Sequence, residues 1–227
     1  MDSLKKTWVF FGNYEPYWSV MSSEEYQNKN IESNFKKFYD SSQSLITLMK
    51  DFLKSNNIEF KFKKIVDFGC GVGRITNLLS EFGENIYGID ISESHLKIAR
   101  DNIKKDNIQF IGYDDNNNFP IELYNSNLVI SFIVLQHNRP AEMKYFIEKI
   151  LNILDKDGIA LLHIPYIIDN YDKSILDSEM TNIEVHYLEY ETVLEIIENN
   201  NCYLKDKMVM QGISHSSYEY LYLIIKK

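Results

Sequence analysis

Three alternating glycines form the part of this chain best suited to bind a ligand. Gly69, Gly71 and Gly73 follow an apolar run at residues 65–68 and precede a segment with a helical period. Residues without a Cβ let backbone N–H groups approach a ligand closely, and a helix N-terminus adds a partial positive charge. The pattern therefore predicts a turn that binds a nucleotide-like cofactor.

The spacing of these glycines and of the nearby acids narrows the kind of cofactor. The dinucleotide fingerprint G-x-G-x-x-G needs its third glycine where this chain has Arg74. A nicotinamide oxidoreductase is therefore disfavoured. Asp67 precedes the first glycine by two residues, and Asp90 ends the next apolar run, 17 residues after Gly73. A carboxylate at that spacing can accept hydrogen bonds from the two hydroxyls of a ribose.

Histidines supply the candidate proton acceptors. His137 follows an apolar run at residues 127–132, beyond the carboxyl end of a predicted central strand, where α/β sheets bind ligands. Histidine has an ordinary pKa near 6.5 and can take a proton from a hydroxyl group at neutral pH. His137 could instead cap the following helix or bond to backbone, and His163 and His215 are rivals for the role. The other two histidines, expected to be ordinary helix-face and loop residues, are His95 and His186.

The apolar periodicity around these residues predicts an α/β fold. Five strands are expected, at residues 65–68, 86–90, 108–112, 127–132 and 158–164. Helices between them are expected at residues 72–82, 94–104 and 140–154. The last third contains a predicted helix and then two successive strands, at residues 189–199, 203–210 and 218–225. The expected fold is therefore a doubly wound, mostly parallel seven-stranded sheet with an antiparallel C-terminal hairpin.

Composition limits the expected partners and compartment. The chain has 227 residues, of which 44% are hydrophobic, enough to bury a full core. Its net charge is -9 without a long basic run, so we expect no nucleic-acid substrate. Two cysteines imply no disulfide framework and fit a reducing cytoplasm. We expect no signal peptide and no membrane span, hence a soluble cytoplasmic protein.

The glycine turn, its two acids and the phrase at residues 90–94 together resemble the motifs of class I S-adenosylmethionine-dependent methyltransferases. The resemblance covers about residues 61–227 and implies that this domain binds S-adenosyl-L-methionine and releases S-adenosyl-L-homocysteine. It implies cofactor contacts from Gly69, Cys70 and Gly71 to the methionine half and from Asp90 to the ribose. It also implies that Ile91 and the Asp114 side chain contact the adenine, that the neighbouring turn acid Asp115 contributes through its backbone, and that Phe132 contacts the cofactor. A solvated loop is the alternative for Asp114 and Asp115.

Residues 1–60 lie outside this domain and are expected to form a cap or lid. Two helices are expected there, at residues 23–39 and 44–53. Ahead of them, residues 8–18 include six aromatic side chains and both tryptophans of the chain. Tyr14, Tyr17 and Trp18 could face the sulfonium or the substrate, because an aromatic face attracts a cation. The alternative is a hydrophobic staple that packs the extension on the sheet.

These observations favour a methyltransferase that acts on an oxygen of a polar small molecule, such as a sugar or a phosphorylated metabolite. His137 is the candidate general base, and the candidate substrate contacts are Tyr14, Tyr17, Trp18, His163 and His215. No metal is expected, because the strand end near His137 lacks the acid pair of metal-dependent catechol enzymes. A small-amine N-methyltransferase and a non-catalytic cofactor-binding protein are the alternatives. Residues 16–20 also resemble some bacterial methyltransferases of surface-polysaccharide biosynthesis.

Overall fold

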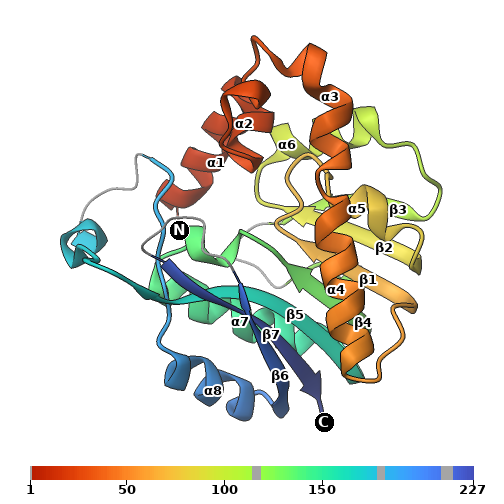
Figure 1. The fold of residues 1–227 in the computed structure, drawn as a ribbon, viewed down its shortest axis with the longest axis vertical. Coiled ribbons are helices and arrows are strands. Elements are labelled where there is room, and N and C mark those ends of the chain that lie inside the picture. Colours follow the sequence, from red (N-terminus) through yellow and green to blue (C-terminus); the bar gives the residue numbers. More distant parts are fainter. Residues whose placement is uncertain (1, 114–118, 178–181, 211–216) are drawn as a thin grey trace. The chain divides into compact units, whose positions relative to one another are not determined.

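Seven strands form one mixed sheet in the computed structural model of this chain, which describes residues 2–113, 119–177, 182–210 and 217–227. In chain order the strands are β1 (Phe62–Phe68), β2 (Gly83–Asp90), β3 (Ile108–Gly112), β4 (Ser126–Ser131), β5 (Leu154–Ile168), β6 (Cys202–Met210) and β7 (Ser217–Lys226). Their spatial order is β3-β2-β1-β4-β5-β7-β6 (Figure 1). β7 runs antiparallel to β5 and β6, whereas β1, β2 and β3 are mutually parallel and β4 is parallel to β5. The predicted α/β fold with an antiparallel C-terminal hairpin is confirmed.

The chain divides into two compact units. The N-terminal unit is Lys5–Asn117, and the C-terminal unit is Asn118–Lys227 together with Met1–Leu4. These two units are defined by which residues pack together. The cap at residues 1–60 and the methyltransferase-like domain at residues 61–227 are assigned by expected function, and both assignments stay predictions.

The strands of the N-terminal unit bring their carboxyl ends to one edge. Phe68 of β1 pairs with Ile89 of β2, and Asp90 pairs with Gly112 of β3. The helices that follow β1 and β2 are α5 (Thr76–Leu79) and α6 (Glu93–Asn102). α5 is shorter at both ends than the helix predicted at residues 72–82. Its late start follows from the left-handed backbone of Gly73, with φ of +80°, which keeps that part of the chain in a turn.

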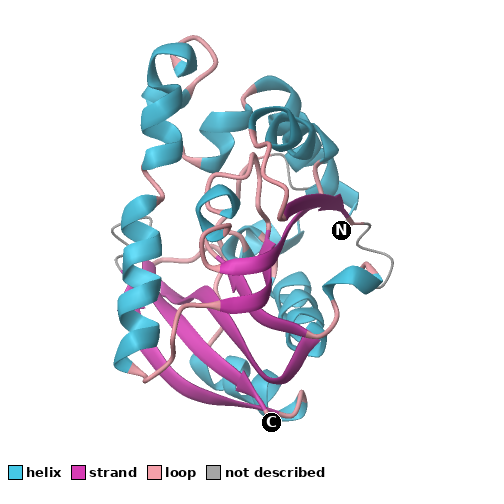
Figure 2. Cartoon of the chain, turned by 90° about the vertical axis from the view of Figure 1, so that its right-hand side faces the viewer, coloured by secondary structure: helices cyan, strands magenta, loops and turns pink. Residues whose placement is uncertain are grey.

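The N-terminal segment of this unit is helical almost throughout. Its elements are α1 (Asp2–Tyr14), α2 (Pro16–Val20), the 3-10 turn η1 (Glu24–Tyr26), α3 (Ile31–Asp40) and α4 (Gln43–Ser55). The helix expected at residues 23–39 is divided, because Asn30 Nδ2 donates to the Glu24 carbonyl oxygen at 2.9 Å and stabilises a turn before α3. In Figure 1, α3 and α4 lie end to end, and in Figure 2 the short link between these two helices is drawn in pink.

The C-terminal unit carries the other four strands. Its helices and 3-10 turns are η2 (Ile121–Leu123), η3 (Leu135–His137), α7 (Pro140–Ile153), η4 (Lys173–Asp177) and α8 (Tyr190–Asn199). All residues from Gly158 to Pro165 of β5 are buried, as expected of a strand covered on both faces. Central strand β5 therefore places His163 in the core rather than at a solvent-exposed strand end.

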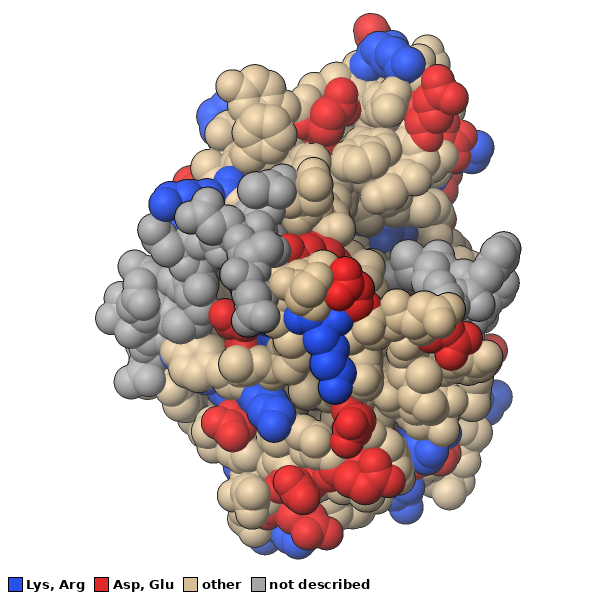
Figure 3. Space-filling model, turned by 90° about the vertical axis from the view of Figure 1, so that its left-hand side faces the viewer, with Lys and Arg blue, Asp and Glu red and all other residues tan. Residues whose placement is uncertain are grey.

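On the face drawn in Figure 3, acidic and basic side chains are interspersed, so that face carries no continuous basic track among the residues shown in colour. Exposed acids follow one side of α8 at Glu191, Glu195 and Glu198. Within the described ranges, every helix is too short or too polar to cross a bilayer.

Candidate functional site

The glycine turn after β1 depends on three residues that lack a Cβ. Gly69, Gly71 and Gly73 have φ angles of +76°, +53° and +80°, a region that residues with a side chain rarely adopt. A Cβ at Gly73 would lie 2.6 Å from Ile103 Cδ1, and a Cβ at Gly71 would lie 2.8 Å from Val20 Cγ2. Both backbone conformation and close packing therefore require glycine at this turn.

Asp90 holds the glycine turn against the end of β2. The Gly71 N–H donates to Asp90 Oδ2 at 2.9 Å, and the Ser92 N–H donates to Oδ1 at 2.8 Å. The Gly69 N–H also donates to the Ile89 carbonyl oxygen at 2.8 Å. Since an ionised carboxylate has about four lone-pair sites, these two backbone contacts leave capacity for a ligand diol.

Asp67 and Arg74 are buried beside the turn and have structural contacts. Thr76 Oγ1 donates to Asp67 Oδ2 at 2.6 Å, and burial raises the pKa of Asp67 to about 6. Arg74 Nη1 donates to Ser41 Oγ at 3.2 Å, and burial lowers the pKa of its guanidinium. Burial also raises the pKa of the Cys70 thiol well above its usual value. Cys70 is therefore a poor nucleophile and suits the tight turn as a small side chain.

The aromatic residues of the N-terminal segment have different environments. Asn102 Nδ2 donates to the Tyr17 hydroxyl at 3.0 Å, and the Tyr17 ring packs edge-on against Phe38 at a centroid distance of 5.2 Å. Trp18 packs against Phe11 at 5.9 Å, whereas Tyr14 is 62% exposed. Tyr17 thus contributes to packing, and substrate contacts from these three aromatics stay predictions.

Helix α1 docks closely on the start of α6, next to Asp90. A Cβ at Gly12 would lie 2.6 Å from Ser92 Oγ and 2.8 Å from His95 Nδ1. Ser92 Oγ donates to the Trp8 carbonyl oxygen at 3.2 Å, and His95 Nε2 lies 2.9 Å from Ser19 Oγ. His95 lies on the face of α6, as expected, and the docked N-terminal helices leave it only 1% exposed.

Replacing Gly12 with alanine is expected to loosen α1. The new methyl group would overlap the short side chains of Ser92 and His95, which cannot move away without breaking their contacts. We expect the amide exchange rates of α1 to rise about tenfold, which hydrogen-exchange mass spectrometry measures. The matched control is Gly112→Ala, where the nearest atom is the flexible end of Glu93 at 3.2 Å. Unchanged exchange in Gly12→Ala would show that α1 docks by other contacts.

In the C-terminal unit, the end of β4 is strained. Ile133 has a φ of +58°, and a β-branched residue in this left-handed region is held there only by its surroundings. It follows Phe132, whose side chain is 6% exposed and whose ring stacks on that of His163 at a centroid distance of 5.2 Å. Such strain is typical of functional turns.

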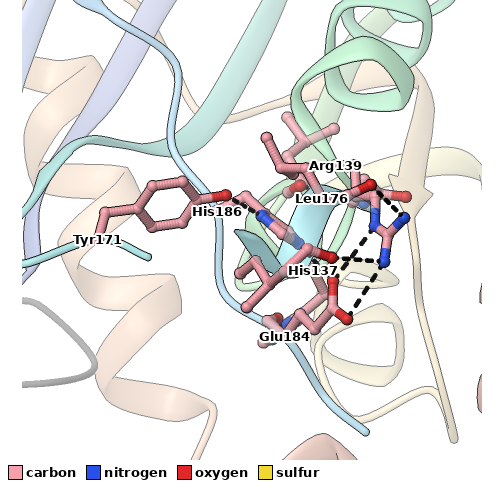
Figure 4. Close-up of polar contacts among 9 residues, drawn as sticks. His137, Arg139, Tyr171, Leu176, Glu184 and His186 are labelled. Carbon is pink, nitrogen blue, oxygen red and sulfur yellow. Dashed lines mark hydrogen bonds and ion pairs between the residues drawn. The ribbon is translucent and has the colours of Figure 1, made fainter. Parts of the chain in front are cut away.

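His137 is fixed by a network centred on Glu184 (Figure 4). We call His137, Arg139, Tyr171, Glu184 and His186 the Glu184 network. His137 Nδ1 donates to the Glu184 backbone oxygen at 2.8 Å, and Arg139 Nη2 lies 3.4 Å from the Glu184 carboxylate. His186 Nε2 donates to that carboxylate at 2.9 Å, and the Tyr171 hydroxyl donates to His186 Nδ1.

Burial determines the protonation of both histidines in the Glu184 network. Burial lowers the pKa of His137 to about 4, so its imidazole is neutral at pH 7. Because Nδ1 donates to a carbonyl, Nε2 carries the lone pair of His137. Burial also lowers the pKa of His186, which is 0% exposed. His186 lies in a loop, as expected, and both of its ring nitrogens are used to fix that loop.

Three predicted site residues, Asp114, Asp115 and His215, lie outside the described residues. Of the others, the N-terminal unit brings the glycine turn, Asp90 and Ile91 together. The C-terminal unit brings Phe132 against His163.

Comparison with known proteins defines the family. Residues 65–158 match the family described as a methyltransferase domain. The ubiquinone biosynthesis O-methyltransferase of Pelagibacter ubique is 22% identical over 51% of this chain and 48% of its own length. A carboxy-S-adenosyl-L-methionine synthase of Yersinia pseudotuberculosis is 33% identical over 55% of this chain and 52% of its own length. The chain thus spans about half the length of these curated relatives.

A solved structure extends the likeness to the whole fold. Magnesium protoporphyrin IX methyltransferase from Synechocystis PCC 6803, with bound S-adenosylhomocysteine, aligns with a TM-score of 0.66 and 16% identity, covering 99% of this chain and 98% of that one. This chain contains a class I S-adenosylmethionine-dependent methyltransferase domain. The family expected from the glycine turn and Asp90 is confirmed.

The methyltransferase family uses S-adenosyl-L-methionine, and the N-terminal unit offers groups that fit it. Asp90 is 9% exposed and has lone pairs left for the ribose hydroxyls, while the glycine turn has no side chain to obstruct the methionine half. Ile91 is half-buried and supplies an apolar surface for an adenine ring. The individual cofactor contacts of this methyltransferase domain stay predictions.

Proposed function

We propose that this domain transfers a methyl group from S-adenosyl-L-methionine to a hydroxyl of a polar small molecule, such as a sugar or a phosphorylated metabolite. The observation that supports an oxygen acceptor is the buried, neutral imidazole of His137 with a fixed tautomer. A hydroxyl has to lose its proton during transfer, and a neutral imidazole nitrogen can accept it. His137 is the candidate base that the sequence favours.

The bound cofactor supplies a methyl group that its sulfonium already activates. The work left to the protein is to align the acceptor, exclude water and receive the hydroxyl proton. Arg139 is engaged by the carbonyl oxygens of Ile175 and Leu176, each at 3.0 Å, and by Glu184. Because this guanidinium is already engaged, we propose that the acceptor is bound mainly through its hydroxyl groups rather than through an anionic group on Arg139.

Calorimetry and a labelled-methyl assay test this function. We expect S-adenosyl-L-homocysteine to bind with micromolar affinity and NAD to show no measurable heat, because the third glycine is displaced and Asp90 is placed for a single ribose. Labelled S-adenosyl-L-methionine should then methylate members of a panel of monosaccharides and sugar phosphates. A panel of small amines is the matched comparison.

Each alternative has a distinct outcome in these assays. Transfer to amines alone would replace the oxygen acceptor by a nitrogen acceptor. Binding of S-adenosyl-L-homocysteine without transfer to any panel member would favour a non-catalytic cofactor-binding protein. Binding of NAD in preference to S-adenosyl-L-homocysteine would contradict the methyltransferase function.

A further inference from the structure

A second buried histidine in the C-terminal unit has a carboxylate partner. His163 of β5 is 2% exposed, and Glu219 of β7 is 0% exposed. The strand register pairs Glu219 with Pro165, so Glu219 and His163 are diagonal neighbours on one face of the sheet. His163 Nε2 lies 2.7 Å from Glu219 Oε2. The two side chains are therefore in direct polar contact in the core.

Two further contacts hold this pair in place. Ser217 Oγ donates to Glu219 Oε1 at 2.9 Å, which fixes the carboxylate from its other oxygen. The Phe132 ring stacks on the imidazole with an interplanar angle of 24°. The His163 ring is thus held on one face by the residue after β4 and at Nε2 by Glu219.

The position of the proton follows from the contact between His163 and Glu219. His163 Nε2 and Glu219 Oε2 lie 2.7 Å apart without a well-aligned hydrogen bond. Two lone pairs this close repel each other unless one atom carries a proton, and we assign that proton to Nε2. Nδ1 then holds the lone pair of a neutral imidazole. In the part of the chain that the structure describes, this buried Nδ1 has no hydrogen-bond partner. A buried nitrogen without a partner costs free energy unless a ligand meets it.

The pair lies near enough to His137 to share its electrostatic environment. Burial is the main cause of the lowered pKa of His137; His163 lowers it further, whereas the Glu219 carboxylate acts in the opposite direction and raises it. His137 Nδ1 donates to a backbone carbonyl, whereas His163 contacts a carboxylate that can stabilise an imidazolium. An orienting carboxylate of this kind is what a histidine base uses in acyl-transfer triads.

We propose that the acceptor hydroxyl proton goes to His163 rather than to His137, the base that the sequence favours, and that Glu219 positions His163 for this role. The inference rests on the proposed oxygen acceptor. The acceptor oxygen bonds to the methyl carbon as the carbon–sulfur bond breaks, and the electron pair of that bond stays on sulfur. The hydroxyl proton moves to Nδ1 of His163, and Glu219 balances the resulting positive charge. His137 then orients the acceptor as a neutral hydrogen-bonding group.

Nuclear magnetic resonance of the cofactor-free protein tests the pair without any acceptor. The chain has 5 histidines, so ¹⁵N-histidine labelling gives few signals and the tautomer of each can be assigned. We expect His163 to carry its proton on Nε2 at pH 7, and Glu219→Gln to make that proton exchange with solvent about tenfold faster. A proton on Nδ1, or an unchanged signal in Glu219→Gln, would overturn the proposal.

Kinetics with a hydroxylated acceptor from the labelled-methyl panel provide the second test. His163→Asn should lower kcat about 100-fold and His137→Asn about tenfold, with the affinity for S-adenosyl-L-homocysteine unchanged in both. Glu219→Gln should lower kcat about tenfold and alter the pH profile, and Glu219→Asp should recover part of the loss. The control is Tyr218→Phe, an exposed neighbour on the opposite face of β7.

The outcomes separate this inference from the proposed function. If the wild-type protein methylates a hydroxyl and His163→Asn retains most of kcat, the base assignment is wrong while the function stands. If the wild-type protein methylates no hydroxyl, the proposed function fails first. The resonance measurement then still decides whether Glu219 holds His163 as described.

Discussion

Replacing Asp90 with alanine is expected to weaken S-adenosyl-L-homocysteine binding about 100-fold, measured by titration calorimetry. Two charge-assisted hydrogen bonds to a ribose diol contribute about 1.5–3 kcal/mol each, and a 100-fold change corresponds to about 2.7 kcal/mol. The variant also removes the acceptor of the Gly71 and Ser92 N–H groups, at 2.9 and 2.8 Å. The glycine turn would therefore lose both a ligand contact and its anchor on β2.

Two variants separate these contributions. Asp90→Asn keeps the shape and one acceptor oxygen, so we expect a loss of about tenfold. Glu84→Ala removes an exposed acid from the same strand and should leave the affinity unchanged. If Asp90→Ala folds normally and binds within about threefold of wild type, Asp90 does not bind the ribose.

The glycine turn and the strand order could be predicted because their signals are local. The three glycines are needed where the backbone has positive φ, and the acid two residues after Gly88 ends a strand whose apolar period is plain in the sequence. The C-terminal hairpin also follows from two strand-like runs with no helix between them. Local chemistry therefore predicted the family, which the comparisons confirm.

Contacts between distant segments could not be predicted in the same way. The burial of His95 and His186 was not predicted, because their partners, Ser19 and Tyr171, lie in segments whose packing no local pattern specifies. The helix α1 was not predicted, because its aromatic residues lie on several sides of the helix and Gly12 has a low helix propensity. Tertiary packing decides both cases.

The burial of Glu219 could have been predicted from the sequence. It is the single acid within β7, and alternation along a strand places it on the same face as Leu221 and Leu223. An acid on the buried face of a strand needs a partner. The pattern alone would have predicted a buried pair, but it could not have selected His163 as the partner.

Acidification is expected to destabilise the protein through His137. Burial lowers the pKa of His137 from 6.5 to about 4, so the unfolded chain binds its proton at a higher pH than the folded protein does. A group of this kind stabilises the fold above pH 6.5, and its contribution is lost as pH falls toward about 4. A shift of that size corresponds to about 3 kcal/mol.

Urea unfolding at pH 7, 6, 5 and 4 measures this effect when wild type is compared with His137→Asn. The wild-type curve alone is ambiguous, because Asp67, with its pKa raised to about 6, acts in the opposite direction and stabilises the fold as it becomes protonated. The variant retains Asp67 and lacks only the His137 titration. The stability difference between the two proteins should therefore decrease by about 3 kcal/mol from pH 7 to pH 4. A difference that does not vary with pH would mean that His137 titrates normally in the folded protein, and the neutral imidazole that supports an oxygen acceptor would then be lost.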